Sequence, residues 1–84
     1  MSKSIYYYSA EWCEPCKALG PTMEQIAKQI PVQKRNVDYT DPAIIAEAKV
    51  RSVPTVVLME NGRELKRFTG NRSFSEIINW LNEG

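Results

Sequence analysis

Residues 9–21 read SAEWCEPCKALGP and place the only two cysteines of the chain, Cys13 and Cys16, two residues apart. Residues 4–9 (SIYYYS) form a continuous apolar and aromatic run, which is typical of a strand buried on both faces. From Cys13 onward, apolar residues recur every three or four positions, as on one side of a helix. They are Ala18, Leu19, Met23, Ile26, Ala27 and Ile30. The cysteine pair is therefore predicted to lie where a strand passes into a helix.

Three prolines mark the course of this predicted helix. Pro15 falls in the first turn, where a missing N–H costs little. Pro21 lies inside the helix and predicts a kink, because its ring removes one backbone hydrogen bond. Pro31 is expected to end the helix.

The rest of the chain predicts five further elements. They are a strand (residues 32–38), a short helix (40–50), a hairpin (strands 55–59 and 64–69) and a final helix (73–84). Asp41 is the expected N-cap of the short helix, and Asn61-Gly62 the hairpin turn. Ser73 and Glu76 have the spacing of a capping box. The expected apolar stripe of the final helix is Phe74, Ile77, Ile78 and Leu81.

The element order β-α-β-α-β-β-α predicts one α/β domain over residues 1–84, with a parallel first crossover and a four-stranded mixed sheet. Eleven basic and ten acidic side chains leave a net charge of +1, and no basic run suggests a nucleic-acid partner. The opening MSKSIYYYSAEW is too polar for a signal peptide or a membrane span. We therefore expect a cytoplasmic protein with no membrane association. A monomer is expected, because no apolar helix face is left over.

Three interpretations of the cysteine pair compete. A zinc site needs four ligands, and the chain has two cysteines and no histidine, so no metal is expected. A purely structural disulfide would close a very short loop, which gains little entropy, and the cytosol keeps thiols reduced. A redox couple fits a Cys-x-x-Cys motif within a β-α-β pattern.

The position of Cys13 gives a physical reason for redox chemistry. Free N–H groups at a helix entrance favour a thiolate over a thiol. Cys16 lies one turn further in, and its N–H can donate toward the Cys13 sulfur. We expect Cys13 to be exposed and nucleophilic, and Cys16 to be partly buried and able to resolve a mixed disulfide.

The motif EWCEPCK (residues 11–17) resembles the Trp-Cys-Gly-Pro-Cys-Lys motif of thioredoxins. Further matches follow in the same order: GP (20–21), NVD (36–38), SVPT (52–55), NG (61–62) and Gly70. The resemblance covers nearly the whole chain. It implies a compact, glutaredoxin-sized thioredoxin-like fold that lacks the leading strand and helix of full-length thioredoxins.

The resemblance also implies roles for individual residues. Cys13 matches the attacking thiol and Cys16 the resolving thiol. Trp12 matches the aromatic that shapes the substrate surface, although a surface-packed Trp is an equal alternative. Pro54 matches a cis proline facing the disulfide, which leaves the Val53 backbone to pair with an extended substrate.

The resemblance implies that Gly70 lets a backbone approach closely at the same substrate surface as Trp12 and Pro54. The alternative is a simple turn glycine. Two other positions depart from the family pattern. Tyr7 stands where the family has a buried acid that assists proton transfer to and from the resolving thiol. Tyrosine, with a pKa near ~10, is a poor base at neutral pH, and core packing is its simplest role. Lys34 thereby loses its partner, and we expect it either to reach solvent or to hydrogen-bond Tyr7.

The second departure is Glu14, which stands where the family has glycine. Its carboxylate gains from the helix dipole but repels a thiolate on Cys13. We therefore expect Glu14→Gly to lower the pKa of the Cys13 thiol. Pro15 and Lys17 complete the motif and are counted with Glu14 as modulators of the cysteine pair.

Taken together, the resemblance implies a thiol-disulfide oxidoreductase that reduces protein disulfides and is itself reduced by a thioredoxin reductase or a similar donor. No nucleotide fingerprint is present, so neither flavin nor nicotinamide is expected, and the redox group is the cysteine pair itself. A glutaredoxin-type, glutathione-dependent reductase is an alternative that suits the length. Its usual Cys-Pro-Tyr-Cys motif and its glycine pair are not evident. A third possibility is a binding module that uses Trp12, Val53 and Pro54 without turnover.

Overall fold

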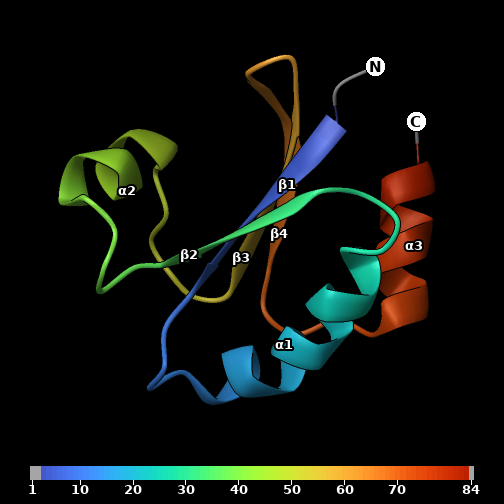
Figure 1. The fold of residues 1–84 in the computed structure, drawn as a ribbon, viewed down its shortest axis with the longest axis horizontal. Coiled ribbons are helices and arrows are strands. Elements are labelled where there is room, and N and C mark those ends of the chain that lie inside the picture. The colour runs from blue at the N-terminus through green and yellow to red at the C-terminus, as the bar shows by residue number, and fades with distance from the viewer. Residues whose placement is uncertain (1–2, 84) are drawn as a thin grey trace.

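The computed structural model describes residues 3–83, which form three helices and one four-stranded sheet of order β2-β1-β3-β4 (Figure 1). The elements are β1 (Lys3–Ser9), α1 (Glu14–Ile26), β2 (Val32–Asn36), α2 (Pro42–Ala48), β3 (Thr55–Glu60), β4 (Arg63–Thr69) and α3 (Phe74–Asn82). Strand β1 is parallel to β2 and antiparallel to β3, and β3 is antiparallel to β4. The predicted element order and mixed sheet are confirmed.

The main core lies between the sheet and the helices α1 and α3, which contact each other (Figure 1). Its buried residues are Ile5, Tyr7, Leu19, Met23, Ile26, Val56, Leu58, Phe68, Ile77 and Trp80. Helix α2 lies apart from α1 and α3 and has no buried residue. The start of α1 is thus fixed by a packed core, whereas α2 depends on other contacts.

Several element boundaries differ from the prediction by one or two residues, and the end of α1 differs by four. Helix α1 ends at Ile26 rather than at residue 30, because the Lys28 and Gln29 amides donate to carbonyls three residues back, which tightens the chain into turns. Strand β2 ends at Asn36 rather than at residue 38. The Asn36 side chain accepts the Asp38 N–H at 2.9 Å, a local turn that competes with strand pairing.

Helix α3 has the predicted capping box but a different buried side. The Ser73 hydroxyl accepts the Glu76 N–H at 3.2 Å, and the Glu76 carboxylate accepts the Ser73 N–H at 3.0 Å. The expected stripe is partly wrong, because Phe74 is 40% exposed whereas Trp80 is buried. Trp80 meets the edge of Phe68 with ring centroids 4.9 Å apart. Trp80 follows Ile77 by three positions and so lies on the same side of the helix, which the predicted stripe omitted.

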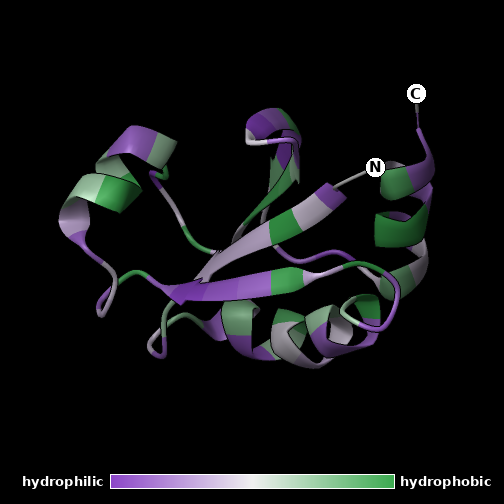
Figure 2. Ribbon diagram, turned by 45° about the horizontal axis from the view of Figure 1, so that its top comes forward, coloured by the Kyte–Doolittle hydropathy of each residue, from purple (hydrophilic) through white to green (hydrophobic). Residues whose placement is uncertain are grey.

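Strand β2 forms one edge of the sheet and is hydrophilic along most of its length (Figure 2). Arg35 of β2 lies over the Tyr6 ring, 4.0 Å from its centroid, and donates to the Tyr8 hydroxyl at 3.0 Å. These contacts cover part of the sheet face that α1 and α3 do not reach. Of the helices within residues 3–83, not one has the length and apolar character needed to cross a membrane.

We predict that Ser73→Ala lowers the free energy of unfolding by about 1 kcal/mol, because the Glu76 amide then loses its capping acceptor. Urea denaturation followed by circular dichroism measures the change. Ser75→Ala in the same exposed turn is the matched control and should have a much smaller effect. Equal losses in the two variants would contradict the capping role.

Candidate active site

Cys13 is the N-cap residue of α1 and is disulfide-bonded to Cys16. Its backbone is extended (φ −91°, ψ 112°), and its sulfur accepts the Cys16 N–H at 3.2 Å. The two Cα atoms lie 5.2 Å apart. The predicted placement of one sulfur at a helix entrance, with its partner one turn behind, is confirmed. An amide aimed at this sulfur also stabilises a thiolate there after reduction.

The expected difference in exposure between the two cysteines is wrong for this disulfide form. Cys13 is 4% exposed and Cys16 is 5% exposed. Both pack with Ala10, and the partly buried Val37 and Val53 cover this cluster. The carbonyl oxygen of Val53 lies 3.5 Å from the Cys13 sulfur. The asymmetry of the pair therefore comes from the helix N-terminus and the neighbouring loop rather than from exposure.

The loop that covers Cys13 comprises residues 49–54 and joins α2 to β3. The Val53–Pro54 bond is cis, as predicted. Among residues 3–83, no backbone group is hydrogen-bonded to the amide or the carbonyl of Val53. The adjacent Pro54 carbonyl accepts the Gly70 N–H at 3.0 Å. The Val53 backbone beside the sulfur is thus available to an extended polypeptide.

Gly70 has φ +84°, a conformation that favours glycine. A Cβ at this position would meet no atom within 4 Å. Its backbone conformation, and not internal crowding, therefore requires glycine here. Its hydrogen bond to the Pro54 carbonyl places Gly70 next to the cis proline.

Trp12 stands beside the disulfide with its side chain 66% exposed. Its indole Nε1 donates to the Asp38 carboxylate at 2.9 Å, which orients the ring. Next to Asp38, Tyr39 is 79% exposed, and the nearby Glu11 carboxylate raises the pKa of its hydroxyl. The sequence did not indicate that Glu11, Asp38 and Tyr39 lie around Trp12. The NVD match was the one signal that pointed toward Asp38.

A groove of about 210 Å³ begins at Trp12 and runs along the covering loop. It is lined by Trp12, Val37, Ile45, Val50, Arg51, Ser52 and Val53. Most of these side chains are apolar, and Ile45 belongs to α2. No pattern in the sequence indicates that α2 contributes to this wall.

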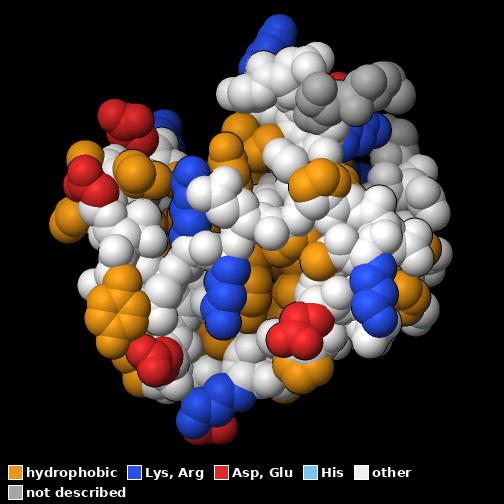
Figure 3. Space-filling view, in the orientation of Figure 1, with side chains coloured by type: hydrophobic (Ala, Val, Ile, Leu, Met, Phe, Trp, Pro, Cys, Tyr) orange, Lys and Arg blue, Asp and Glu red, His pale blue; other side chains and the backbone are white. Residues whose placement is uncertain are grey.

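Tyr7 is a buried core residue whose hydroxyl donates to the Cys16 carbonyl at 3.2 Å. Burial raises the pKa of this hydroxyl, so even less of the ionised form that could accept a proton is present at neutral pH. Lys34 reaches solvent, which is one of its two expected arrangements. Both residues line a cavity of about 340 Å³ that also touches Cys16 and Lys17. Figure 3 shows this side of the molecule hollowed between β2 and α1, with hydrophobic side chains on the floor.

Glu14 and Lys17 form an exposed ion pair along the first turn of α1, with Nζ and Oε1 3.1 Å apart. Pro15 lies in the same turn, as predicted. The ammonium group of Lys17 offsets part of the carboxylate's field at the neighbouring Cys13. The repulsion expected from Glu14 alone is therefore reduced.

Comparisons with known proteins agree with this geometry. The family model described as Thioredoxin matches residues 2–83. A thioredoxin of Rickettsia felis is 36% identical over 78 residues, which span 88% of this chain and 73% of the relative. A thioredoxin of Rickettsia bellii is 38% identical over 77 residues, which span 87% and 72% of the two chains.

Among solved structures, a mutant thioredoxin from Halobacterium salinarum superposes with a TM-score of 0.88 at 29% identity, covering 95% of this chain and 72% of the other. Fold, sequence and the Cys13–Cys16 pair thus agree. The chain belongs to the thioredoxin family and is a dithiol-disulfide oxidoreductase of the thioredoxin type.

Proposed function

We propose that this chain reduces disulfide bonds in other proteins, with Cys13 as the attacking thiol and Cys16 as the resolving thiol. The observation that carries the proposal is the Cys16 N–H directed at the Cys13 sulfur at the N-terminus of α1. In the reduced protein this donor favours the Cys13 thiolate, which is the nucleophilic form. Cys16 lacks such a position, since it lies inside the helix.

The reaction transfers two electrons in two exchanges. The Cys13 thiolate attacks one sulfur of the target disulfide, forms a mixed disulfide and releases the other target sulfur, which takes a proton. Cys16 then loses its proton and attacks the Cys13 sulfur. The Cys13–Cys16 disulfide forms, and the second target sulfur leaves as a thiolate. The target gains two thiols and this chain is oxidised.

The proposed substrate surface consists of Trp12, Val53, Pro54 and Gly70. Support comes from the exposed indole, the available Val53 backbone and the groove between them. An extended target segment pairs with Val53 as an added strand would, and its side chains lie in the apolar groove. This arrangement holds the target sulfur next to Cys13.

The proposed electron donor is a thioredoxin reductase. One relative, 36% identical over 78 residues, is the bifunctional thioredoxin reductase/thioredoxin of Mycobacterium leprae, of which this chain spans 17%. We further propose a monomer that works in the cytoplasm, where such a reductase keeps the pair reduced. The small net charge of +1 supports protein rather than nucleic-acid partners.

We predict that Cys16→Ser accumulates a covalent complex with insulin through Cys13, because the resolving thiol is gone. Non-reducing gel electrophoresis measures the complex, and Cys13→Ser is the matched control that should form none. The unmodified protein should accelerate insulin reduction by dithiothreitol. Trapping through Cys16 instead, or no acceleration, would contradict the proposal. Turnover driven by glutathione and glutathione reductase would favour the glutaredoxin-type alternative.

We predict that Glu14→Gln lowers the pKa of the Cys13 thiol by less than about one unit, because a carboxylate charge on the residue after Cys13 is removed and Lys17 is left unpaired. Thiolate absorbance against pH measures the shift. Glu24→Gln, further along α1, should leave the pKa unchanged. A raised pKa in Glu14→Gln would refute the electrostatic argument.

We predict that Tyr7→Phe keeps the pH profile of insulin reduction and lowers the free energy of unfolding by about 1 kcal/mol. The hydroxyl is a donor to the Cys16 carbonyl, and its raised pKa leaves it protonated at neutral pH. Stopped-flow rates between pH 6 and 9 and urea denaturation test the two parts. A displaced pH profile would show that Tyr7 carries the proton of Cys16.

A further inference from the structure

The loop of residues 49–54 has few attachments to the body of the domain at its α2 end. Helix α2 has no buried residue, and its last carbonyl groups have no partner further along the helix. Yet this end of α2 and the loop build one wall of the groove beside Cys13. The loop also carries the Val53 carbonyl, 3.5 Å from the Cys13 sulfur.

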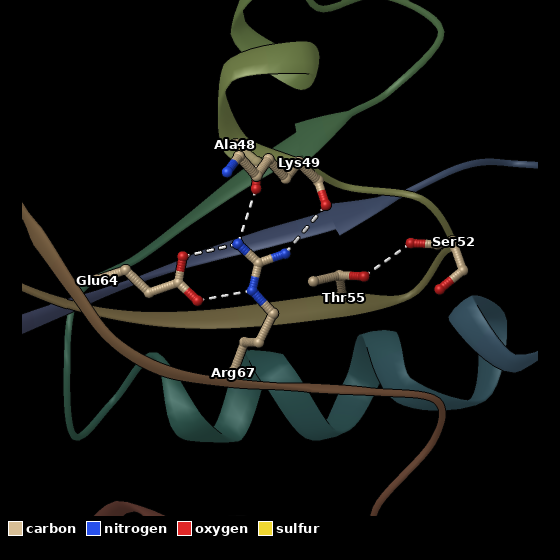
Figure 4. A network of polar contacts seen from close by, with 6 residues as sticks. All are labelled: Ala48, Lys49, Ser52, Thr55, Glu64 and Arg67. Carbon is tan, nitrogen blue, oxygen red and sulfur yellow. Dashed lines mark hydrogen bonds and ion pairs between the residues drawn. The ribbon is translucent and has the colours of Figure 1, made fainter.

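Among the residues that the structure describes, one side chain is hydrogen-bonded to the carbonyl groups at this end of α2. The guanidinium of Arg67, on β4, donates to the Ala48 carbonyl at 2.7 Å and to the Lys49 carbonyl at 3.3 Å (Figure 4). These carbonyls belong to the last residue of α2 and its C-cap. A planar group with donors on two nitrogens suits two neighbouring acceptors.

Glu64 fixes the orientation of Arg67. The two carboxylate oxygens of Glu64 accept from Nε and Nη2 of Arg67, each at 2.6 Å. Within a regular strand, residues three apart point to opposite faces. The β3–β4 register shifts between Leu58 and Met59, so that Leu65 is an extra residue in β4. This bulge brings Glu64 and Arg67 to the same face.

The other end of the loop is held independently. The Thr55 hydroxyl donates to the Ser52 carbonyl at 2.7 Å (Figure 4), and the Gly70 amide donates to the Pro54 carbonyl at 3.0 Å. Val53 lies between the two attachments. If the hydrogen bonds from Arg67 were removed, Ser52 and Pro54 would keep their attachments, but residues 49–51, which lead from α2 into Val53 and form part of the groove wall, would lose their restraint.

We propose that Arg67, oriented by Glu64, is a positioning residue that sets the covering loop for an extended polypeptide substrate without touching the reacting sulfurs. The inference rests on the proposed function, because it assumes that targets pair with the Val53 backbone. Hydrogen bonds donated by Arg67 lower the pKa of the Glu64 carboxyl, so the pair stays ionised at neutral pH. The Glu64–Arg67 pair is then a determinant of substrate class.

The test compares two disulfides with the reduced protein in stopped flow. Insulin has a backbone that can pair with Val53, whereas dithiobis(nitrobenzoate) is small and has none. Arg67→Met should lower the rate constant with insulin roughly tenfold and change the rate with the small disulfide less than about twofold. Arg63→Met, an exposed arginine on the same strand, is the matched control and should leave both rates unchanged.

Glu64→Gln is the second variant, since it keeps Arg67 and serves if Arg67→Met does not fold. It should lower the rate constant with insulin less than Arg67→Met does. It should also change the rate with the small disulfide less than the rate with insulin. A general loss of structure would slow both substrates equally. Equal slowing, or no slowing with insulin, would overturn the role of Arg67.

A second measurement does not depend on activity. In Arg67→Met, the amides of Lys49 and Val50, which donate to the Ala46 and Ile45 carbonyls, should exchange with deuterium roughly tenfold faster than in the unmodified protein, and those of residues 77–82 should not change. Unchanged exchange at Lys49 and Val50 would overturn the inference. If the unmodified protein reduces the small disulfide but not insulin, the proposed function fails. The exchange rates then decide the role of Arg67 separately.

Discussion

The hydrogen bond from the Cys16 amide to the Cys13 sulfur is the contact on which the chemistry of this protein depends. Its geometry follows from the packing of α1, whose residues Leu19 and Ile26 are fully buried against the sheet. Because the core fixes the helix and β1 delivers the chain to its entrance, the amide points at the sulfur without further support. A hydrogen-bond donor held in place before the reaction needs no rearrangement when negative charge develops.

The substrate side of the site is built differently. The Val53 carbonyl reaches Cys13 across forty positions in the chain, and the loop that carries it is attached through β4 at its α2 end and through Gly70, just past β4, at the other. Polar contacts rather than core packing hold the α2 end. The Cys13 sulfur is therefore held by a helix that the core fixes. The loop at the substrate surface depends instead on a few side-chain hydrogen bonds.

Local signals explain what could be predicted from the sequence. The N-cap position of Cys13, the Asn61-Gly62 turn and the Ser73–Glu76 box all depend on residues within four positions of each other. The cis bond before Pro54 could be predicted only from the family resemblance. The burial of Cys13 could not be predicted, because the loop that covers it, residues 49–54, is far from Cys13 in the sequence. Likewise, nothing in the sequence indicates the bulge that pairs Glu64 with Arg67.

The outer edge of β2 has a consequence for how this molecule behaves in a crowded solution. A strand at the edge of a sheet presents backbone donors and acceptors to which any extended chain can add. Gln33 and Lys34 are exposed on this strand, and Arg35 is stacked on Tyr6. Charged side chains on an edge strand disfavour this addition. The composition of β2 thus disfavours the addition of a further strand at this edge of the sheet, whereas β4 forms the other edge.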